Sequence, residues 1–253
     1  MSGIGRRRSR REAERLLPDR LKSILRGSGG GSVDGALPGL ARPPASRFSV
    51  LRQPSAQASE ASRQSRGLEE FFSYIRDQSG LTILDLGGAT QQNVSFITNL
   101  GHRLYSEDFL QILRETFDED KYDSASQSNP GRIEYFLQQT LDYPPGQFNG
   151  VLVWNALEYL SPALLAATIA RLRKIMRPKS YMLAFFHSDD KLEAVPEYSF
   201  RIQQTASLRV TQRGVHRPAQ LFNNRGLEKL FGQFESVKFF LARDRLREVI
   251  VKA

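Results

Sequence analysis

The feature that most constrains the fold is a short apolar run that ends in two glycines and is followed, at a set distance, by an acid. Residues 83–86 (Ile-Leu-Asp-Leu) read as a buried strand, and Gly87 and Gly88 follow as a tight turn. A second strand-like run, residues 103–107, leads to Asp108, which lies 21 residues past Gly87 (108 − 87). This order is typical of a nucleotide-binding β-α-β unit, in which glycines admit a ligand and the acid accepts hydrogen bonds from ribose hydroxyls.

Composition limits the chemistry that the chain can perform. The 253 residues are 25% charged and 40% hydrophobic, which suits a soluble globular domain with one core. With no cysteine and only three histidines, thiolate chemistry is excluded and we expect no metal site. No apolar run reaches the roughly 18 residues of a membrane-spanning helix, so we expect no membrane span and a cytoplasmic location.

The positive charge is confined to the start of the chain. Residues 1–66 hold 14 Lys+Arg and 5 Asp+Glu (14 − 5 = +9), whereas residues 67–253 hold 22 of each and are neutral. The first segment is also rich in Gly, Pro and Ser and buries too little apolar surface to offset its ordering entropy. We therefore expect a disordered basic tail over 1–66 and a folded domain over 67–253.

Two interpretations of this tail stay open. The arginines of residues 6–11 are suited to a nucleic acid or another anionic partner, bound without specificity. Phe48 is the only aromatic residue of the tail, so base stacking has little support. The other interpretation is a solvated tail or an arm that docks on a partner protein.

From Gly67 onward the pattern alternates between strands and helices. We expect seven strands, at 82–86, 103–107, 133–137, 150–154, 181–186, 236–242 and 246–251. The last two are joined too tightly for a parallel crossover and should form a C-terminal antiparallel hairpin. Residues 187–221 are expected to be irregular, with strand character near 200–210. The order implies an α/β fold, with a seven-stranded, mostly parallel sheet and helices on both faces.

Four segments of the folded part resemble the motifs of the class I S-adenosylmethionine (SAM)-dependent methyltransferases. They are the glycine turn, the acidic strand end at 105–109, the strand region 148–160 and the helix end at 172–178. Residues 67–253 thus look like a class I methyltransferase-like domain, similar to an uncharacterised bacterial branch of the family. The resemblance implies a Rossmann-like sheet, SAM as the cofactor and an unidentified small-molecule acceptor.

The resemblance also assigns cofactor contacts. It places the turn against the amino-acid end of SAM, Asp85 near its ammonium, Asp108 and then Glu107 at the ribose, and Gln139 and Thr140 beside the adenine. The full set of expected cofactor-binding residues is Asp85, Gly87, Gly88, Ala89, Glu107, Asp108, Gln139, Thr140 and Trp154. Ala89, Gln91 and Asn149 depart from the family pattern.

Three residues are candidates for the acceptor side, where the expected fourth and fifth strands end. Asn155 is placed to orient an acceptor, Glu158 to help deprotonate one, and His187 to act as the base. The alternatives are a solvated helix start for Glu158 and a surface-loop histidine for His187. Methyl transfer relies mainly on orientation, worth roughly 7–11 kcal/mol, so no catalytic triad is required.

Three functions follow from these observations. The first is a SAM-dependent methyltransferase acting on a small molecule. The second is a protein that binds or methylates nucleic acid (RNA) through its basic tail. The third, suggested by Ala89, Gln91 and Asn149, is a non-catalytic interaction protein that keeps the fold without the cofactor.

Overall fold

The computed structural model describes residues 60–117, 126–241 and 245–253, all within the unit that runs from Ser55 to Ala253. The expected tail over residues 1–59 therefore lies outside the described residues. Residues 60–66 are folded: β1 (Glu60–Gln64) pairs antiparallel with β7 (Ser207–His216), and Ser65 caps the next helix. The assignment of residues 60–66 to the tail is therefore wrong.

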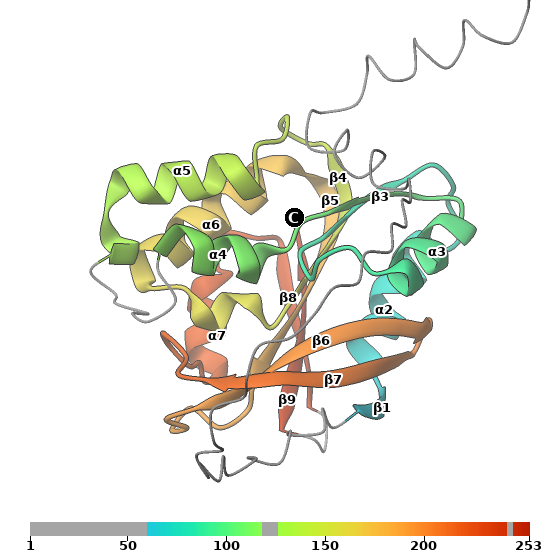
Figure 1. Ribbon diagram of the computed structural model, residues 1–253. Coiled ribbons are helices and arrows are strands. Elements are labelled where there is room, and N and C mark those ends of the chain that lie inside the picture. The colour runs from blue at the N-terminus through green and yellow to red at the C-terminus, as the bar shows by residue number, and fades with distance from the viewer. Residues whose placement is uncertain (1–59, 118–125, 242–244) are drawn as a thin grey trace, which may run out of the picture. The chain divides into compact units, whose positions relative to one another are not determined.

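A six-stranded sheet with the order β3-β2-β4-β5-β9-β8 forms the centre of the described chain (Figure 1). The first four strands are parallel, and β9 pairs antiparallel with both β5 and β8. The strands are β2 (Thr82–Asp85), β3 (Arg103–Ser106), β4 (Phe148–Trp154), β5 (Met176–His187), β8 (Ser236–Leu241) and β9 (Leu246–Lys252). The carboxyl ends of the four parallel strands consequently meet at one edge, where ligands bind in sheets of this kind.

The expected strand at 133–137 is wrong, so the described sheet has six strands and not seven. Those residues lie in helix α5 (Pro130–Thr140). Asn129 caps this helix by accepting hydrogen bonds from two backbone N–H groups, and proline occupies its first position. Ile133, Phe136 and Leu137 also follow a helical spacing rather than an alternating one.

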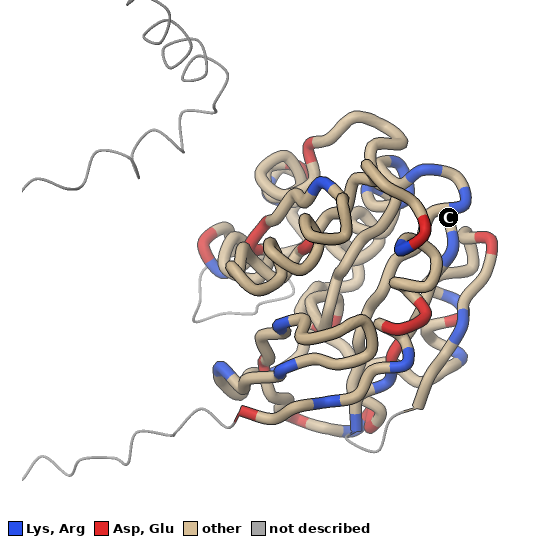
Figure 2. Tube along the Cα trace, turned by 90° about the vertical axis from the view of Figure 1, so that its right-hand side faces the viewer, with Lys and Arg blue, Asp and Glu red and all other residues tan. Residues whose placement is uncertain are grey.

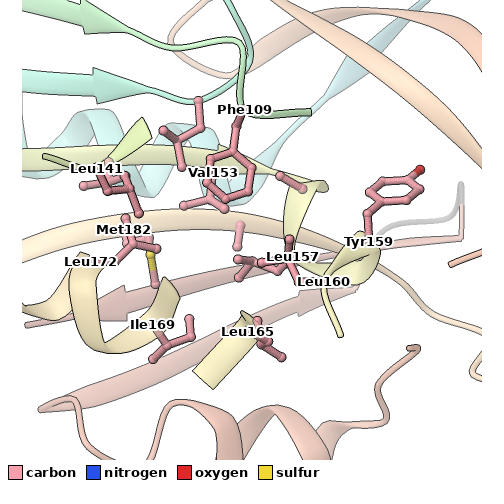
Figure 3. Packing of buried hydrophobic residues seen from close by; sticks show 14 of the residues in the cluster. Phe109, Leu141, Val153, Leu157, Tyr159, Leu160, Leu165, Ile169, Leu172 and Met182 are labelled. Atoms are coloured by element: carbon pink, nitrogen blue, oxygen red, sulfur yellow. The ribbon is translucent and has the colours of Figure 1, made fainter. Parts of the chain in front are cut away.

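Helices cover both faces of the sheet (Figure 1). One face carries α4 (Phe109–Phe117), η4 (Ser126–Ser128), α5, η5 (Ala156–Tyr159), α6 (Pro162–Ile175) and α7 (Asn224–Leu230). The other face carries α2 (Arg66–Ile75) and α3 (Gln91–Asn99). On the first face Phe109, Leu172 and Met182 pack into one buried cluster from a helix, a second helix and the sheet (Figure 3). No described helix is long and apolar enough to cross a membrane.

A second, three-stranded sheet joins β1, β7 and β6 (Val195–Gln204) in the order β1-β7-β6. It occupies most of the segment that was expected to be irregular, so the strand character extends well beyond 200–210. Asn93 of α3 fixes this sheet to the domain, because its amide donates to the Phe200 carbonyl at 3.2 Å and accepts from the Ile202 N–H at 2.8 Å. The small sheet thus packs on the same face as α2 and α3.

Candidate active site

Asp85, the last residue of β2, connects three parts of the sheet edge. Its buried carboxylate accepts hydrogen bonds from the Gly87 N–H at 2.9 Å, from Trp154 Nε1 at 2.6 Å and from Asn93 Nδ2 at 2.9 Å. Burial raises the pKa of Asp85, and the hydrogen bonds from Trp154, Gly87 and Asn93 oppose that rise. A ligand ammonium at this carboxylate would therefore compete with the protein's own donors.

The raised pKa of Asp85 makes stability depend on pH in a defined direction. A carboxyl whose pKa rises on folding stabilises the fold fully below its unfolded value of 3.8, and this contribution is lost as pH rises through the folded-state pKa. Relative to an Asp85→Asn variant, the wild type should thus lose free energy of unfolding as pH rises. Urea titrations of both proteins between about pH 4 and about pH 8 measure this difference, and parallel curves would contradict it.

Each glycine of the turn is required for a different structural reason. Gly88 adopts φ +81°, in the left-handed region that favours glycine, and its N–H donates to the Glu107 carbonyl at 3.0 Å. A Cβ on Gly87 would lie 2.7 Å from both Cδ1 and Nε1 of Trp154. Gly88 is thus required by the backbone, whereas Gly87 is required by the indole that lies against it. Ala89 follows as an exposed residue of the turn.

Two carboxylates lie beside this turn, at the end of β3. Gly87 forms a backbone bridge with Asp108, and a Cβ on Gly88 would lie 3.2 Å from Asp108 Oδ2. Asp108 is exposed and caps α4 by accepting from the Gln111 N–H at 3.1 Å. Glu107 accepts from the Tyr143 hydroxyl at 2.7 Å. The structure therefore brings both predicted ribose contacts to the glycine turn.

Gln139 and Thr140, the two residues expected beside the adenine, lie in a helix rather than after a strand. Gln139 and Thr140 form the last turn of α5, and Thr140 is buried with its hydroxyl donating to the Phe136 carbonyl at 2.8 Å. Their expected role depended on a strand at 133–137 that the structure does not contain. Tyr143, from the following loop, reaches the site instead. Burial, together with the bond to Glu107, raises the pKa of Tyr143. A single loop tyrosine before two prolines gave no signal in the sequence.

A buried glutamate–histidine pair lies at the ends of β4 and β5. Glu158, in η5, accepts from the His187 N–H at 2.8 Å, and its other oxygen lies 2.6 Å from His187 Nδ1. Burial raises the pKa of Glu158, and the adjoining His187 and the Arg247 cation oppose that rise. Glu158 is therefore not a solvated helix start, and His187, which is 3% exposed, is not a surface-loop residue.

The geometry of the pair leaves one ring nitrogen available. If Nδ1 carries the proton and donates it to the carboxylate, Nε2 is the acceptor of the neutral ring. Within the described residues, Nε2 and the side-chain nitrogen of Asn155 are both buried and have no hydrogen-bond partner. Buried polar atoms are rarely left unpaired in folded proteins, so each of these two nitrogens can still form a hydrogen bond with another group.

Aromatic side chains of β6 cover this edge. Tyr198 stacks on the His187 ring with centroids 6.3 Å apart, and Phe200 stacks on Trp154 at 5.0 Å with the rings 7° from parallel. Phe200 and Tyr198 also contact each other at 6.1 Å. The small sheet therefore connects the glycine-turn side of the edge with the His187 side.

A cavity of about 660 Å³ opens between the loop after β5 and the loop after β7. Asp190, Glu193, Arg217 and Gln220 are among its lining residues. The Gln220 N–H donates to the Glu158 carbonyl at 3.2 Å, so the cavity wall adjoins the backbone of the buried pair. Its volume is in the range of small-molecule sites, about 300–1,000 Å³.

Comparisons with known proteins gave structural neighbours only. No family model and no curated protein matches the chain. Three solved structures that resemble it are a Burkholderia thailandensis 1,6-didemethyltoxoflavin-N1-methyltransferase with S-adenosylhomocysteine (12% identity, TM-score 0.42), an Archaeoglobus fulgidus SAM-dependent methyltransferase (16%, 0.44) and the glycopeptide N-methyltransferase MtfA with SAM (14%, 0.39). Each comparison covers 74% of this chain, and respectively 76%, 91% and 94% of the neighbour.

All three neighbours are methyltransferases by name. With identities of 16% or less and TM-scores of 0.44 or less, the likeness is too low to transfer a substrate or a residue role. What the site of this chain does has to follow from its own side chains.

Proposed function

We propose that the protein is a SAM-dependent methyltransferase that acts on a small-molecule acceptor at the carboxyl edge of its main sheet. The observation that carries this proposal is that Glu158 and His187 form a buried pair with an unpaired ring nitrogen at the same sheet edge as the glycine turn and its two carboxylates. The Glu158–His187 pair is suited to accept a proton, and the two carboxylates beside the turn are suited to hold a ribose.

The residues at the turn fit the cofactor at its nucleoside end. The carboxylates of Glu107 and Asp108 would accept hydrogen bonds from the ribose hydroxyls, and Gly88 presents no side chain to that space. SAM, when bound, supplies a methyl group activated as a sulfonium. At the amino-acid end, the Trp154 indole lies against the Cβ position of Gly87 and donates a hydrogen bond to Asp85.

On the acceptor side, the pair supplies proton transfer. An acceptor hydroxyl or amine would donate its hydrogen bond to His187 Nε2. That nitrogen would take the proton as the acceptor oxygen or nitrogen bonds to the methyl carbon and the carbon–sulfur bond breaks, with S-adenosylhomocysteine as the leaving group. Glu158 then stabilises the imidazolium, because its carboxylate holds the Nδ1 proton. General-base assistance of this kind contributes about 10²–10⁴-fold in rate. Asn155, through its unpaired side-chain nitrogen, would orient an acceptor oxygen.

An Asp108→Asn variant tests the cofactor end. Asparagine keeps the cap on α4 but removes the charge from the ribose contact, and hydrogen bonds to charged groups contribute about 1.5–3 kcal/mol. We therefore expect the affinity for S-adenosylhomocysteine to fall by at least about tenfold, since 1.4 kcal/mol is a factor of ten. Isothermal titration calorimetry of the full chain measures the change.

The matched control is Asp77→Asn, because Asp77 is an exposed carboxylate just past α2 and is 84% exposed. Its affinity should equal that of the wild type. Equal losses in the two variants, or a wild type that does not bind S-adenosylhomocysteine, would contradict the proposed function.

Nucleic-acid binding gains no support from the described residues. Lys and Arg occur together with Asp and Glu along the trace drawn in Figure 2. This agrees with the neutral net charge of residues 67–253 (22 − 22 = 0). The arginine cluster that suggested such a function lies outside the described residues.

A further inference from the structure

Trp154 lies against the glycine turn. It is the last residue of β4, is 2% exposed and has φ 55°, in the left-handed region that bulky side chains rarely adopt. The indole lies 2.7 Å from the Cβ position of Gly87, so it fills the space that the missing side chain leaves open. The indole therefore covers the Cβ side of Gly87, although the rest of this glycine is exposed.

Three contacts hold the indole in this position. Nε1 donates to Asp85 Oδ1 at 2.6 Å, the ring stacks on Phe200, and its edge meets Phe185 at 5.7 Å. The N–H of the indole therefore gives Asp85 the same kind of donor that a ligand ammonium would give it. Because the side chain satisfies a carboxylate that a ligand would otherwise satisfy, the two compete for one position.

We propose that Trp154 is an intramolecular occupant of the amino-acid end of the cofactor site, and that SAM binds only when the indole leaves Gly87 and releases Asp85. This inference rests on the proposed function. Only the molecules in which the indole has turned away bind SAM. The apparent affinity is therefore the affinity of that open form multiplied by its fraction of the population. The departure of the indole also removes the stack on Phe200, the neighbour of Tyr198, so cofactor entry loosens the cover over His187.

The chain carries its own reporter for this movement, because Trp154 is its only tryptophan. Titration of the full wild-type chain with S-adenosylhomocysteine should shift the tryptophan emission to the red and increase its quenching by acrylamide. Adenosine is the matched ligand control. It lacks the amino-acid end, so it should leave the emission unchanged even at saturation.

A variant that removes only the N–H contact gives a second readout. Trp154→Phe keeps an aromatic ring in the core but frees Asp85, and it should bind S-adenosylhomocysteine at least about tenfold more tightly than the wild type, in line with the population argument. Phe186→Leu is the control, because the Phe186 ring packs against Phe222 and Phe231 on the other face of the sheet, away from the indole, and its affinity should equal that of the wild type. Calorimetry measures affinity, and circular dichroism verifies that both variants are folded.

The outcomes separate the inference from the proposed function. Binding to the wild type with unchanged emission, and with equal affinity in Trp154→Phe, overturns the inference and leaves the methyltransferase proposal in place. Binding to Trp154→Phe but not to the wild type supports the occupant and refutes the proposed function, because the site is then permanently closed. Absence of binding in both folded proteins overturns both.

Discussion

Replacing His187 by glutamine is expected to lower the rate of methyl transfer by about 10²–10⁴-fold, the range of general-base assistance. Glutamine presents an amide where Nε2 lies, so the acceptor proton has no base to receive it. S-adenosylhomocysteine affinity should stay within about twofold of the wild type, because the exchange does not alter the glycine turn or its carboxylates. The measurement is transfer of a labelled methyl group from SAM to acceptors in a small-molecule extract, together with calorimetry.

The control for this exchange is His216→Gln. His216 is partly exposed on β7 and lies 3.4 Å from Glu197, so it is a histidine–carboxylate pair outside the main-sheet edge. Its rate should remain within about twofold of the wild type, as expected for a group that stabilises no transition state. Equal rate losses in the two variants would show that His187 acts through structure and is not the base.

Replacing Glu248 by alanine is expected to lower the free energy of unfolding by about 3–5 kcal/mol, the cost of leaving one partner of a buried ion pair unpaired. Glu248, on β9, is 1% exposed and pairs with Arg63 NH1 at 2.5 Å. It also accepts hydrogen bonds from the Ser65 hydroxyl and the Gly67 N–H. Without Glu248, the buried Arg63 guanidinium would lack its carboxylate partner. The segment between β1 and α2 would also lose its hydrogen bonds to Glu248. Urea denaturation measures the effect.

Glu60→Ala is the control, because Glu60 lies on the same strand as Arg63 but in an exposed pair with Arg209 at 3.5 Å. Exposed pairs of this kind contribute about 0–1 kcal/mol, so the variant should unfold close to the wild type. Similar losses in the two variants would show that the Arg63–Glu248 pair does not anchor the first strand.

The elements that the sequence predicted well have local signals. β2, its glycine turn and β3 follow one another within a short stretch, and the acid after β3 does lie beside the turn. Ser161 accepts from the Leu164 N–H and is followed by a proline at the first position of α6, which is a local start signal of a helix. In each case the residues that signal the element lie within it, so the local sequence is enough to predict it.

The errors came from competing or distant interactions. Residues 133–137 contain an apolar group that suits a strand as well as a helix, and only the Asn129-Pro130 start distinguishes the two. β1 has no apolar run at all. The strand forms because its backbone pairs with β7 and because Arg63 forms an ion pair with Glu248, which is distant in the sequence. Neither partner is visible from residues 60–64 alone.

In the site, too, individual residues were predicted from the sequence, whereas contacts between distant residues were not. Glu158 and His187 were each predicted as candidates, but their direct contact spans 29 residues and depends on β4 and β5 lying side by side. The position of Trp154 against Gly87 depends on a left-handed backbone at the end of β4 and on Phe200 from the small sheet. No spacing in the sequence encodes that arrangement.

A crystal structure of the full chain grown with S-adenosylhomocysteine tests the central claim most directly, because it locates the ligand and the indole together. We expect the ribose within hydrogen-bonding distance of Glu107 or Asp108, the amino-acid end against Gly87, and Trp154 turned away from Asp85. Crystals in which the ligand lies elsewhere, or in which this edge stays empty with the indole still bonded to Asp85, would contradict the account.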